Sequence, residues 1–340
     1  MKLDLIIPIY NNEHLIHRTL MSIENQSLDL DYIEVLMIND DSTDNTPEII
    51  NNYADEYSNF IAVHIKNGSG SAGTPRNIGL KLASADYVMF LDHDDFFEID
   101  ALEKLYYYIT EYCCDIVFGT YVLVDEDIPI KFVYPDEKQG FFKSLIENKR
   151  LIKIPPSIWT KLFNKDFLLR NHILFPTILG EDTIFMSKAL EYANGICYFG
   201  DEIICYYNLN ESSYTKNISY DYFVEGFTSE EYLFNLYNDL NHEEYYYLRG
   251  EGILNYYINR FMYSELNNYE IEKLMHLFYE FCNRLNLLNI SPQDEKNAMV
   301  FKYILEKDFD NLIKCKNHKP NKLKVISNKF LNKINKYGFW

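Results

Sequence analysis

The chain has 340 residues, 47% of them hydrophobic, and its 51 Asp and Glu residues outnumber 32 Lys and Arg residues, giving a net charge of −19. This size and apolar content suffice for one large α/β domain and a smaller one, whereas the negative charge argues against nucleic acid as a partner. The longest apolar runs last about six residues, far short of the ~20 that a membrane-spanning helix needs. Asp4 interrupts the first of these runs, unlike a signal peptide, so we expect a first β-strand and a cytoplasmic protein.

Short runs rich in β-branched and aromatic residues alternate with amphipathic stretches through the first 120 residues. Residues 3–9, 33–39, 60–65, 87–91 and 115–119 are predicted as strands, and residues 12–26, 45–57, 74–83 and 98–112 as helices. Strands that alternate with helices in this way form a mostly parallel, doubly wound α/β sheet. Ligands bind such sheets beyond the carboxyl ends of the strands, so the residues after each strand are the candidates for a site.

Beyond residue 120 the pattern is less regular. Residues 180–193 predict a helix, and residues 196–208 predict a segment like a β-hairpin. Residues 220–306 show only helical periodicity, with Asn-rich breaks that divide them into about four helices. The chain is therefore predicted to contain an α/β domain at residues 1–219, an α-helical C-terminal appendage at residues 220–310 and a tail at residues 311–340.

The tail is basic and amphipathic. It carries eight Lys and no Asp or Glu, which leaves 24 basic against 51 acidic residues in the first 310. Apolar residues at positions 323, 326, 330, 334 and 337 recur at helical spacing and are flanked by lysines. Two interpretations stay open: peripheral contact with the cytoplasmic face of the plasma membrane, or packing on its own domain or on another subunit of a homo-oligomer.

Polar and small residues follow the predicted strands. After the second strand, Asp40 or Asp41 can accept a hydrogen bond from a base or a ribose hydroxyl; the alternative is a plain loop that caps the next helix. The Gly-rich segment 68–73 lets the backbone approach a ligand closely, and it leads into a helix that bears Arg76. The segment matches neither the phosphate-binding loop of NTPases nor the dinucleotide fingerprint of dehydrogenases, which weakens both of those interpretations.

The stretch "FLDHDDFF" places three carboxylates directly behind a predicted core strand. Asp92 and Asp94 alternate by two, so they share one side of an extended segment while Asp95 turns away. Carboxylate oxygens hold hard divalent cations, and the phosphates of a bound diphosphate complete the coordination shell. The alternative is that Asp95 caps the helix that begins near Glu98 and that the other two are solvated charges.

Taken together, the motifs "IIPIYNN", "NDDSTDNT", "GSGSAGTPRNIGL", "YVMFLDHDD" and "GEDTIF" resemble the family 2 glycosyltransferases of GT-A fold, over roughly residues 1–215. Within that family, "SAGTPRN" and the "DHDD" spacing look like the wall teichoic acid N-acetylglucosaminyltransferases of Gram-positive bacteria. The chain departs from the usual pattern in "NDD", in a longer glycine loop, and in His93 at the centre of its D-x-D motif.

The resemblance implies a nucleotide-sugar pocket in residues 1–219. It implies that Pro8 and Tyr10 line the nucleotide, that Asp40 reads uracil, and that Asn67 and Arg76 complete the nucleoside pocket.

The same resemblance implies that Asp92 and Asp94 hold the ribose and a metal ion, Mn²⁺ or Mg²⁺. Asp182 stands where the family keeps its catalytic base, with Glu181 beside it as a second candidate. Lys216 is, with Arg76, a candidate partner of the diphosphate, although a solvated lysine is the simpler interpretation.

The function that follows is inverting, metal-dependent transfer of one sugar, GlcNAc or another hexose, from a UDP-sugar to a hydroxyl of a bacterial surface glycan such as wall teichoic acid or capsule. The absence of a Q-x-x-R-W motif favours single transfer over processive synthesis. Two rivals stay open: a nucleotidyltransferase that makes a sugar nucleotide, and a non-catalytic glycan-binding module. Trp159 and Lys161 are candidates for the border of the acceptor site, with core packing as the equal alternative.

Overall fold

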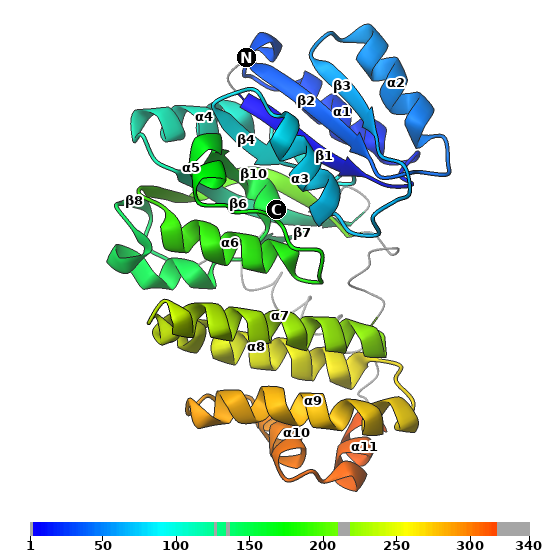
Figure 1. Cartoon of the computed structure of the whole chain (residues 1–340), viewed down its shortest axis with the longest axis vertical. Helices are drawn as coiled ribbons and strands as arrows, with labels where there is room; N and C mark the ends of the chain where they lie inside the picture. Colours follow the sequence, from blue (N-terminus) through cyan, green and yellow to red (C-terminus); the bar gives the residue numbers. More distant parts are fainter. Residues whose placement is uncertain (1–2, 126–127, 134–136, 210–217, 318–340) are drawn as a thin grey trace. The chain divides into compact units, whose positions relative to one another are not determined.

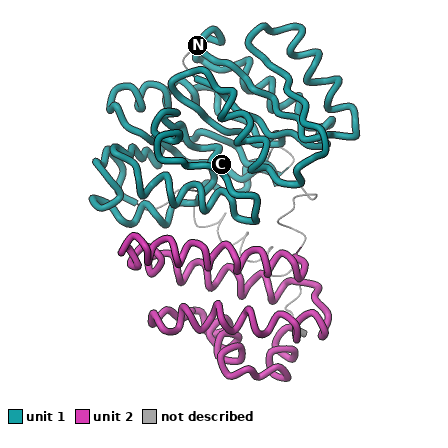
Figure 2. The backbone as a smooth tube through the Cα atoms, viewed as in Figure 1, with its two compact units in different colours: residues 1–213 teal, residues 214–340 magenta. Residues whose placement is uncertain are grey.

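The computed structural model describes residues 3–125, 128–133, 137–209 and 218–317. The chain forms two compact units, Met1–Ser213 and Tyr214–Trp340 (Figure 2). The predicted tail lies outside the described residues from position 318 onward, and its first residues belong to the helix α11 (Phe309–Asn317).

Unit 1 is built around one 10-stranded sheet (Figure 1). Its strands are β1 (Leu3–Ile9), β2 (Ile33–Asn39), β3 (Phe60–His64), β4 (Tyr87–Phe90), β5 (Phe96–Phe97), β6 (Ile116–Asp125), β7 (Ile128–Val133), β8 (Gly140–Phe142), β9 (Lys161–Asn164) and β10 (Ile196–Asn208). Their order in the sheet is β3-β2-β1-β4-β9-β6-β10-β5, with β7 paired to β6 and β8 to β10. The strands from β3 to β4 are parallel, and β9 lies antiparallel between β4 and β6.

The helices of unit 1 are α1 (Ile16–Glu24), α2 (Thr46–Glu56), α3 (Gly73–Leu82), α4 (Ala101–Glu111), α5 (Lys165–Arg170) and α6 (Glu181–Tyr192), with short 3₁₀ segments η1 (Leu30–Tyr32), η2 (Leu145–Lys153) and η3 (Ile158–Thr160). The structure confirms the predicted α/β class, and each strand and helix predicted in the first 120 residues is present within four residues of its expected ends, except that the strand predicted at residues 115–119 continues to Asp125 as β6. Strand β1 is buried along its whole length and pairs in parallel with β2 and β4. Residues that follow these three strands therefore leave the sheet at one edge, where the site lies.

The predicted hairpin at residues 196–208 is wrong. The segment forms the single strand β10, and both of its halves pair in parallel with β6. The register shifts between Tyr198 and Ile203 and again before Cys205, so the "GDE" triplet forms an irregularity within a strand. Glycine and acidic residues are typical of turns and of bulges alike, and the sequence alone does not separate the two.

Unit 2 contains the helices α7 (Tyr220–Asp239), α8 (Glu243–Tyr263), α9 (Asn268–Leu287), α10 (Glu295–Leu305) and α11. Side-chain caps account for three of their starts: Ser219 accepts from the Tyr222 amide, Asp294 caps α10, and Asn267 forms a capping box with Glu270. The interior is aromatic, with Phe ring pairs between α7 and α9. Within the described residues, no helix combines the length and the apolar character needed to cross a membrane.

Candidate active site

The loop after β4 is fixed through its main chain. The His93 carbonyl accepts hydrogen bonds from Asn12 Nδ2 at 2.6 Å and from Thr19 Oγ1 at 2.8 Å, and the same hydroxyl lies 2.8 Å from the Asp95 carbonyl. Thr19 lies in α1 and Asn12 just before it, and both side chains bind the main chain of the loop. Asp92 and Asp94 are both half-buried.

Asp95 turns inward, as the alternation predicts. It is fully buried, and its Oδ1 accepts from the Asn208 amide of β10 at 2.9 Å. Burial, with a smaller contribution from Asp94 and Asp92, raises the pKa of Asp95 well above its usual range. The alternative in which Asp95 caps the next helix is wrong, because α4 begins at Ala101 with Asp100 at its N-cap.

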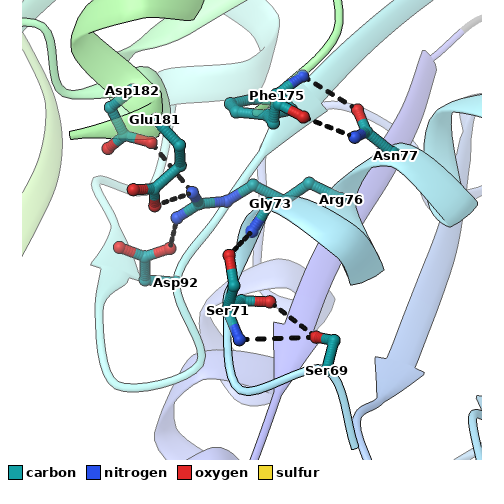
Figure 3. A network of polar contacts seen from close by, with 9 residues as sticks. All are labelled: Ser69, Ser71, Gly73, Arg76, Asn77, Asp92, Phe175, Glu181 and Asp182. Carbon is teal, nitrogen blue, oxygen red and sulfur yellow. Dashed lines mark hydrogen bonds and ion pairs between the residues drawn. The ribbon is translucent and has the colours of Figure 1, made fainter. Parts of the chain in front are cut away.

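A single guanidinium joins three predicted site carboxylates (Figure 3). Arg76 Nη1 lies 2.9 Å from Glu181 Oε1 and 2.8 Å from Asp182 Oδ1, and Nη2 lies 2.7 Å from Asp92 Oδ1. The arginine side chain is only 3% exposed, and its Cζ stands 5.3 Å from the centre of the Phe175 ring. The structure thus brings together Arg76, Asp92, Glu181 and Asp182, which come from α3, the loop after β4 and the first turn of α6.

Three carboxylates around one arginine leave an excess of negative charge. Burial raises the pKa of Asp182 to about 7; Arg76 opposes this shift, and Glu181 and Asp92 reinforce it. A carboxyl group that titrates near neutral pH is suited to accept a proton in catalysis. The cluster is therefore suited to proton transfer.

The glycine-rich loop meets the end of β2. Asp40 is buried, and its carboxylate accepts from the Ser69 amide at 2.9 and 3.1 Å and from Ser69 Oγ at 2.8 Å. Asn67 turns the chain with φ +62°, and a Cβ at Gly68 would lie 2.9 Å from the Asp40 carbonyl. Asp40 and Asn67 thus belong to one junction, and glycine is needed at position 68 because the two backbones touch.

The other predicted nucleotide residues are placed as follows. Pro8 is buried in β1 opposite Ile38 of β2, and Tyr10 follows the strand with 53% of its surface exposed. Lys216 lies outside the described residues.

Trp159 and Lys161 belong to the core. Trp159 is 5% exposed and packs against Tyr121 and Tyr207. Lys161 is 2% exposed, and its ammonium donates to the carbonyls of Pro155 and Ser157. For both residues, the structure therefore agrees with core packing, the alternative to a place at the border of the acceptor site.

The metal-binding potential of the site depends on two carboxylates. Among the residues that the structure describes, no three His, Cys, Asp or Glu side chains form a group that could hold a metal ion by themselves. Asp92 has Oδ1 engaged by Arg76 and keeps 27% of its side chain exposed, and Asp94 lies two residues further on. Two oxygen donors suit a divalent cation that takes its remaining ligands from a substrate diphosphate, so the residues present fit such an ion.

Sequence reasoning misses three residues that build the site. Asn12 and Thr19 hold the loop after β4 through its carbonyls, and Asn77 binds the main chain of Phe175 from α3. Asn12 lies inside the motif "IIPIYNN" and Asn77 inside the motif "GSGSAGTPRNIGL". Their partners are main-chain atoms far away in the sequence, however, and these leave no local pattern.

Comparison with known proteins gives consistent matches. The profile of the Glycosyl transferase family 2 matches residues 4–171. An uncharacterized glycosyltransferase of Haemophilus influenzae is 30% identical over 216 residues, which are 63% of this chain and 82% of that protein. The poly(ribitol-phosphate) beta-glucosyltransferase of Bacillus spizizenii is 28% identical over 89% of this chain, which spans 44% of that protein's length. The structure of S. aureus TarS 1–349 in complex with UDP-GlcNAc superposes with a TM-score of 0.70 at 25% identity and covers 93% of this chain and 91% of that one.

Proposed function

The chain belongs to glycosyl transferase family 2, and on that premise we propose that it transfers a single sugar from a UDP-sugar to a hydroxyl group of a polyol-phosphate glycan. GlcNAc is the first choice of sugar, because the similar TarS structure contains UDP-GlcNAc. A ribitol-phosphate polymer is the first choice of acceptor, because the Bacillus relative is a poly(ribitol-phosphate) glucosyltransferase. The observation that carries the proposal is the Arg76 cluster beside the D-x-D loop.

The donor side uses the carboxyl ends of the first strands. Pro8 and Tyr10 would line the base, Asp40 would read uracil, and Asn67 would shape the nucleoside pocket. The buried Asp40 and the tight junction at Gly68 support this assignment, since the pocket wall is fixed before a ligand arrives.

The departing diphosphate needs positive charge. Asp92 and Asp94 would hold Mn²⁺ or Mg²⁺, which supplies that charge when bound. Arg76 is already buried beside Asp92, and it would add a permanent positive charge on the protein side. Lys216 is proposed as a further partner of the diphosphate.

Asp182 would act as the general base. It would take the proton from the acceptor hydroxyl as the hydroxyl oxygen forms its bond to the anomeric carbon and the bond to the diphosphate breaks on the opposite face. Such an in-line displacement inverts the anomeric configuration. The pKa of Asp182, which burial raises to about 7, supports this role, and Glu181 is the second candidate.

A separate observation argues against each of the two rival functions. Membership of a glycosyltransferase family argues against a nucleotidyltransferase, and the acidic cluster with a raised carboxyl pKa argues against a binding module without activity. Peripheral membrane contact through the tail stays a prediction.

The metal assignment is tested by calorimetry of UDP binding with Mn²⁺ and with a chelator. Asp94→Ala should abolish the part of the UDP affinity that depends on metal, whereas Asp86→Ala, an exposed carboxylate at the other end of β4, should leave it unchanged. Equal UDP affinity with and without chelator in the wild-type chain would overturn the assignment.

A further inference from the structure

The connection between α5 and α6 leads into the acid pair of the site. Residues 171–180 contain neither helix nor strand. Helix α6 begins after Gly180, which has φ +80° and has no side chain with which to cap the first turn. The start of α6 therefore does not by itself fix where Asp182 stands. Contacts with other parts of the chain must therefore fix the position of Asp182.

Asn77 of α3 binds this connection in both directions (Figure 3). Its Nδ2 donates to the Phe175 carbonyl at 2.8 Å, and the Phe175 amide donates to its Oδ1 at 3.0 Å. A side-chain amide that pairs with one residue in this way acts like a strand partner, because it fixes both the position and the direction of the main chain.

The Phe175 ring passes this constraint to α6. It is 3% exposed and stacks on Phe185 with a centroid distance of 4.0 Å and an interplanar angle of 3°. It also packs edge-to-face with Phe90 of β4, with a centroid distance of 5.0 Å. Phe185 lies one helical turn beyond Asp182, so a shift of Phe175 would move the turn that carries the base.

Gly73 shows how tight the junction is. A Cβ at this position would lie 2.7 Å from the Pro176 carbonyl and 3.1 Å from Phe175 Cβ. Gly73, Arg76 and Asn77 are spaced i, i+3 and i+4 on α3 and so share one face. That face contacts the connection, fixes its main chain and pairs with Asp182.

We propose that Asn77 is a positioning residue for sugar transfer: by clamping Phe175 it sets where Asp182 stands relative to Arg76. The inference rests on the proposed function, in which Asp182 is the general base. Asn77 itself touches neither donor nor acceptor in this role.

A double-mutant cycle tests the proposal with UDP-GlcNAc, Mn²⁺ and poly(ribitol phosphate). Asn77→Ala should lower kcat about tenfold to a hundredfold, the scale of a small misplacement of a reacting group, with UDP affinity and the KM for UDP-GlcNAc unchanged. In the Asp182→Asn background the same change should have no further effect, because the group it positions is gone.

Two variants guard against a trivial loss of folding. Asn77→Asp keeps the volume and the acceptor but sets a carboxylate oxygen against the Phe175 carbonyl oxygen in place of the donor, so its loss of kcat should be at least as large as that of Asn77→Ala. Asn59→Ala removes two side-chain bonds to main-chain carbonyls at the amino ends of β2 and β3, away from the site, and should transfer like the wild type.

Three outcomes would contradict the proposal. Wild-type kcat in Asn77→Ala, or an equal loss in both backgrounds, overturns the role of Asn77 and leaves the proposed function standing. Wild-type transfer by Asp182→Asn overturns the assignment of the base and this role with it.

Discussion

Arg76 in unit 1 and Arg249 in unit 2 are both largely buried, but their charge balances are opposite. Arg76 contacts three carboxylates within 2.9 Å. Arg249 lies 3.9 Å from one, Glu230, which is 6% exposed and also feels the charge of Arg284. Burial raises the pKa of Glu230, and the two arginines oppose the shift.

This difference in charge balance distinguishes a site that can do chemistry from a network that stabilises the fold. The three acidic side chains around Arg76 include one, Asp182, whose pKa is about 7. Together they carry more negative charge than Arg76 balances, and this excess attracts a cation. The single acid Glu230 instead faces two arginines, whose positive charges oppose the effect of burial on its pKa. Glu230 and Arg249 come from α7 and α8, so their attraction ties two helices together.

Asp182→Asn gives the largest expected effect. Loss of the general base should reduce transfer by about 10² to 10⁴, which corresponds to roughly 3–5 kcal/mol of transition-state free energy. The fold and the UDP affinity should be retained, since Arg76 keeps two carboxylate partners. Steady-state transfer and calorimetry on the same preparation measure both. Transfer near the wild-type rate would make Glu181 the next residue to test.

Arg249→Met should destabilise the chain without touching the chemistry. It leaves Glu230 buried with one weaker partner, which should lower the free energy of unfolding by about 2–3 kcal/mol. Lys302→Met, which removes an exposed pair with Glu306, is the control and should cost less than about 0.5 kcal/mol. Urea unfolding measures the loss. If the folded Arg249→Met variant bound UDP more weakly than the wild type, the claim that Arg249 supports only the fold would be contradicted.

The pH dependence is the smallest effect. The pKa of Asp182 is raised from 3.8 to about 7, and as the proposed general base Asp182 would act in its deprotonated form. Transfer should therefore rise with pH, with kcat/KM about tenfold lower at pH ~6 than at pH ~8. In Asp182→Asn this rise of kcat/KM with pH should disappear. A wild-type profile that is flat over this range would mean that the group does not titrate there.

The strands and their polar ends can be predicted from the sequence because both are local patterns. The apolar runs that form β1, β2 and β4 indicate that these strands are buried. Asp40 directly follows β2, and Asp92 follows β4 after one residue. The link between Arg76 and its partners cannot be predicted in this way. Arg76 is 16 residues from Asp92 and 106 from Asp182, and no periodicity reports that one guanidinium joins them.

Two other features of the structure could not be predicted from the sequence, for related reasons. Asn77 stands next to Arg76 in its motif, but it binds the main chain of a residue 98 positions away, and main-chain atoms are the same whatever the residue type. Helical periodicity in unit 2 predicts its helices, yet it gives no sign that Glu230 and Arg249 would be buried as a pair.

The most direct test of the central claim is the product itself. The wild-type chain is incubated with UDP-GlcNAc, Mn²⁺ and poly(ribitol phosphate), and the anomeric proton of any new sugar on the polymer is read by NMR, with UDP-glucose as a second donor. The account predicts that the polymer gains single sugars in β linkage, opposite to the α configuration of the donor, with one UDP released for each. An α-linked product would contradict the in-line mechanism, and a polymer that gains no sugar from either donor would contradict the proposed function.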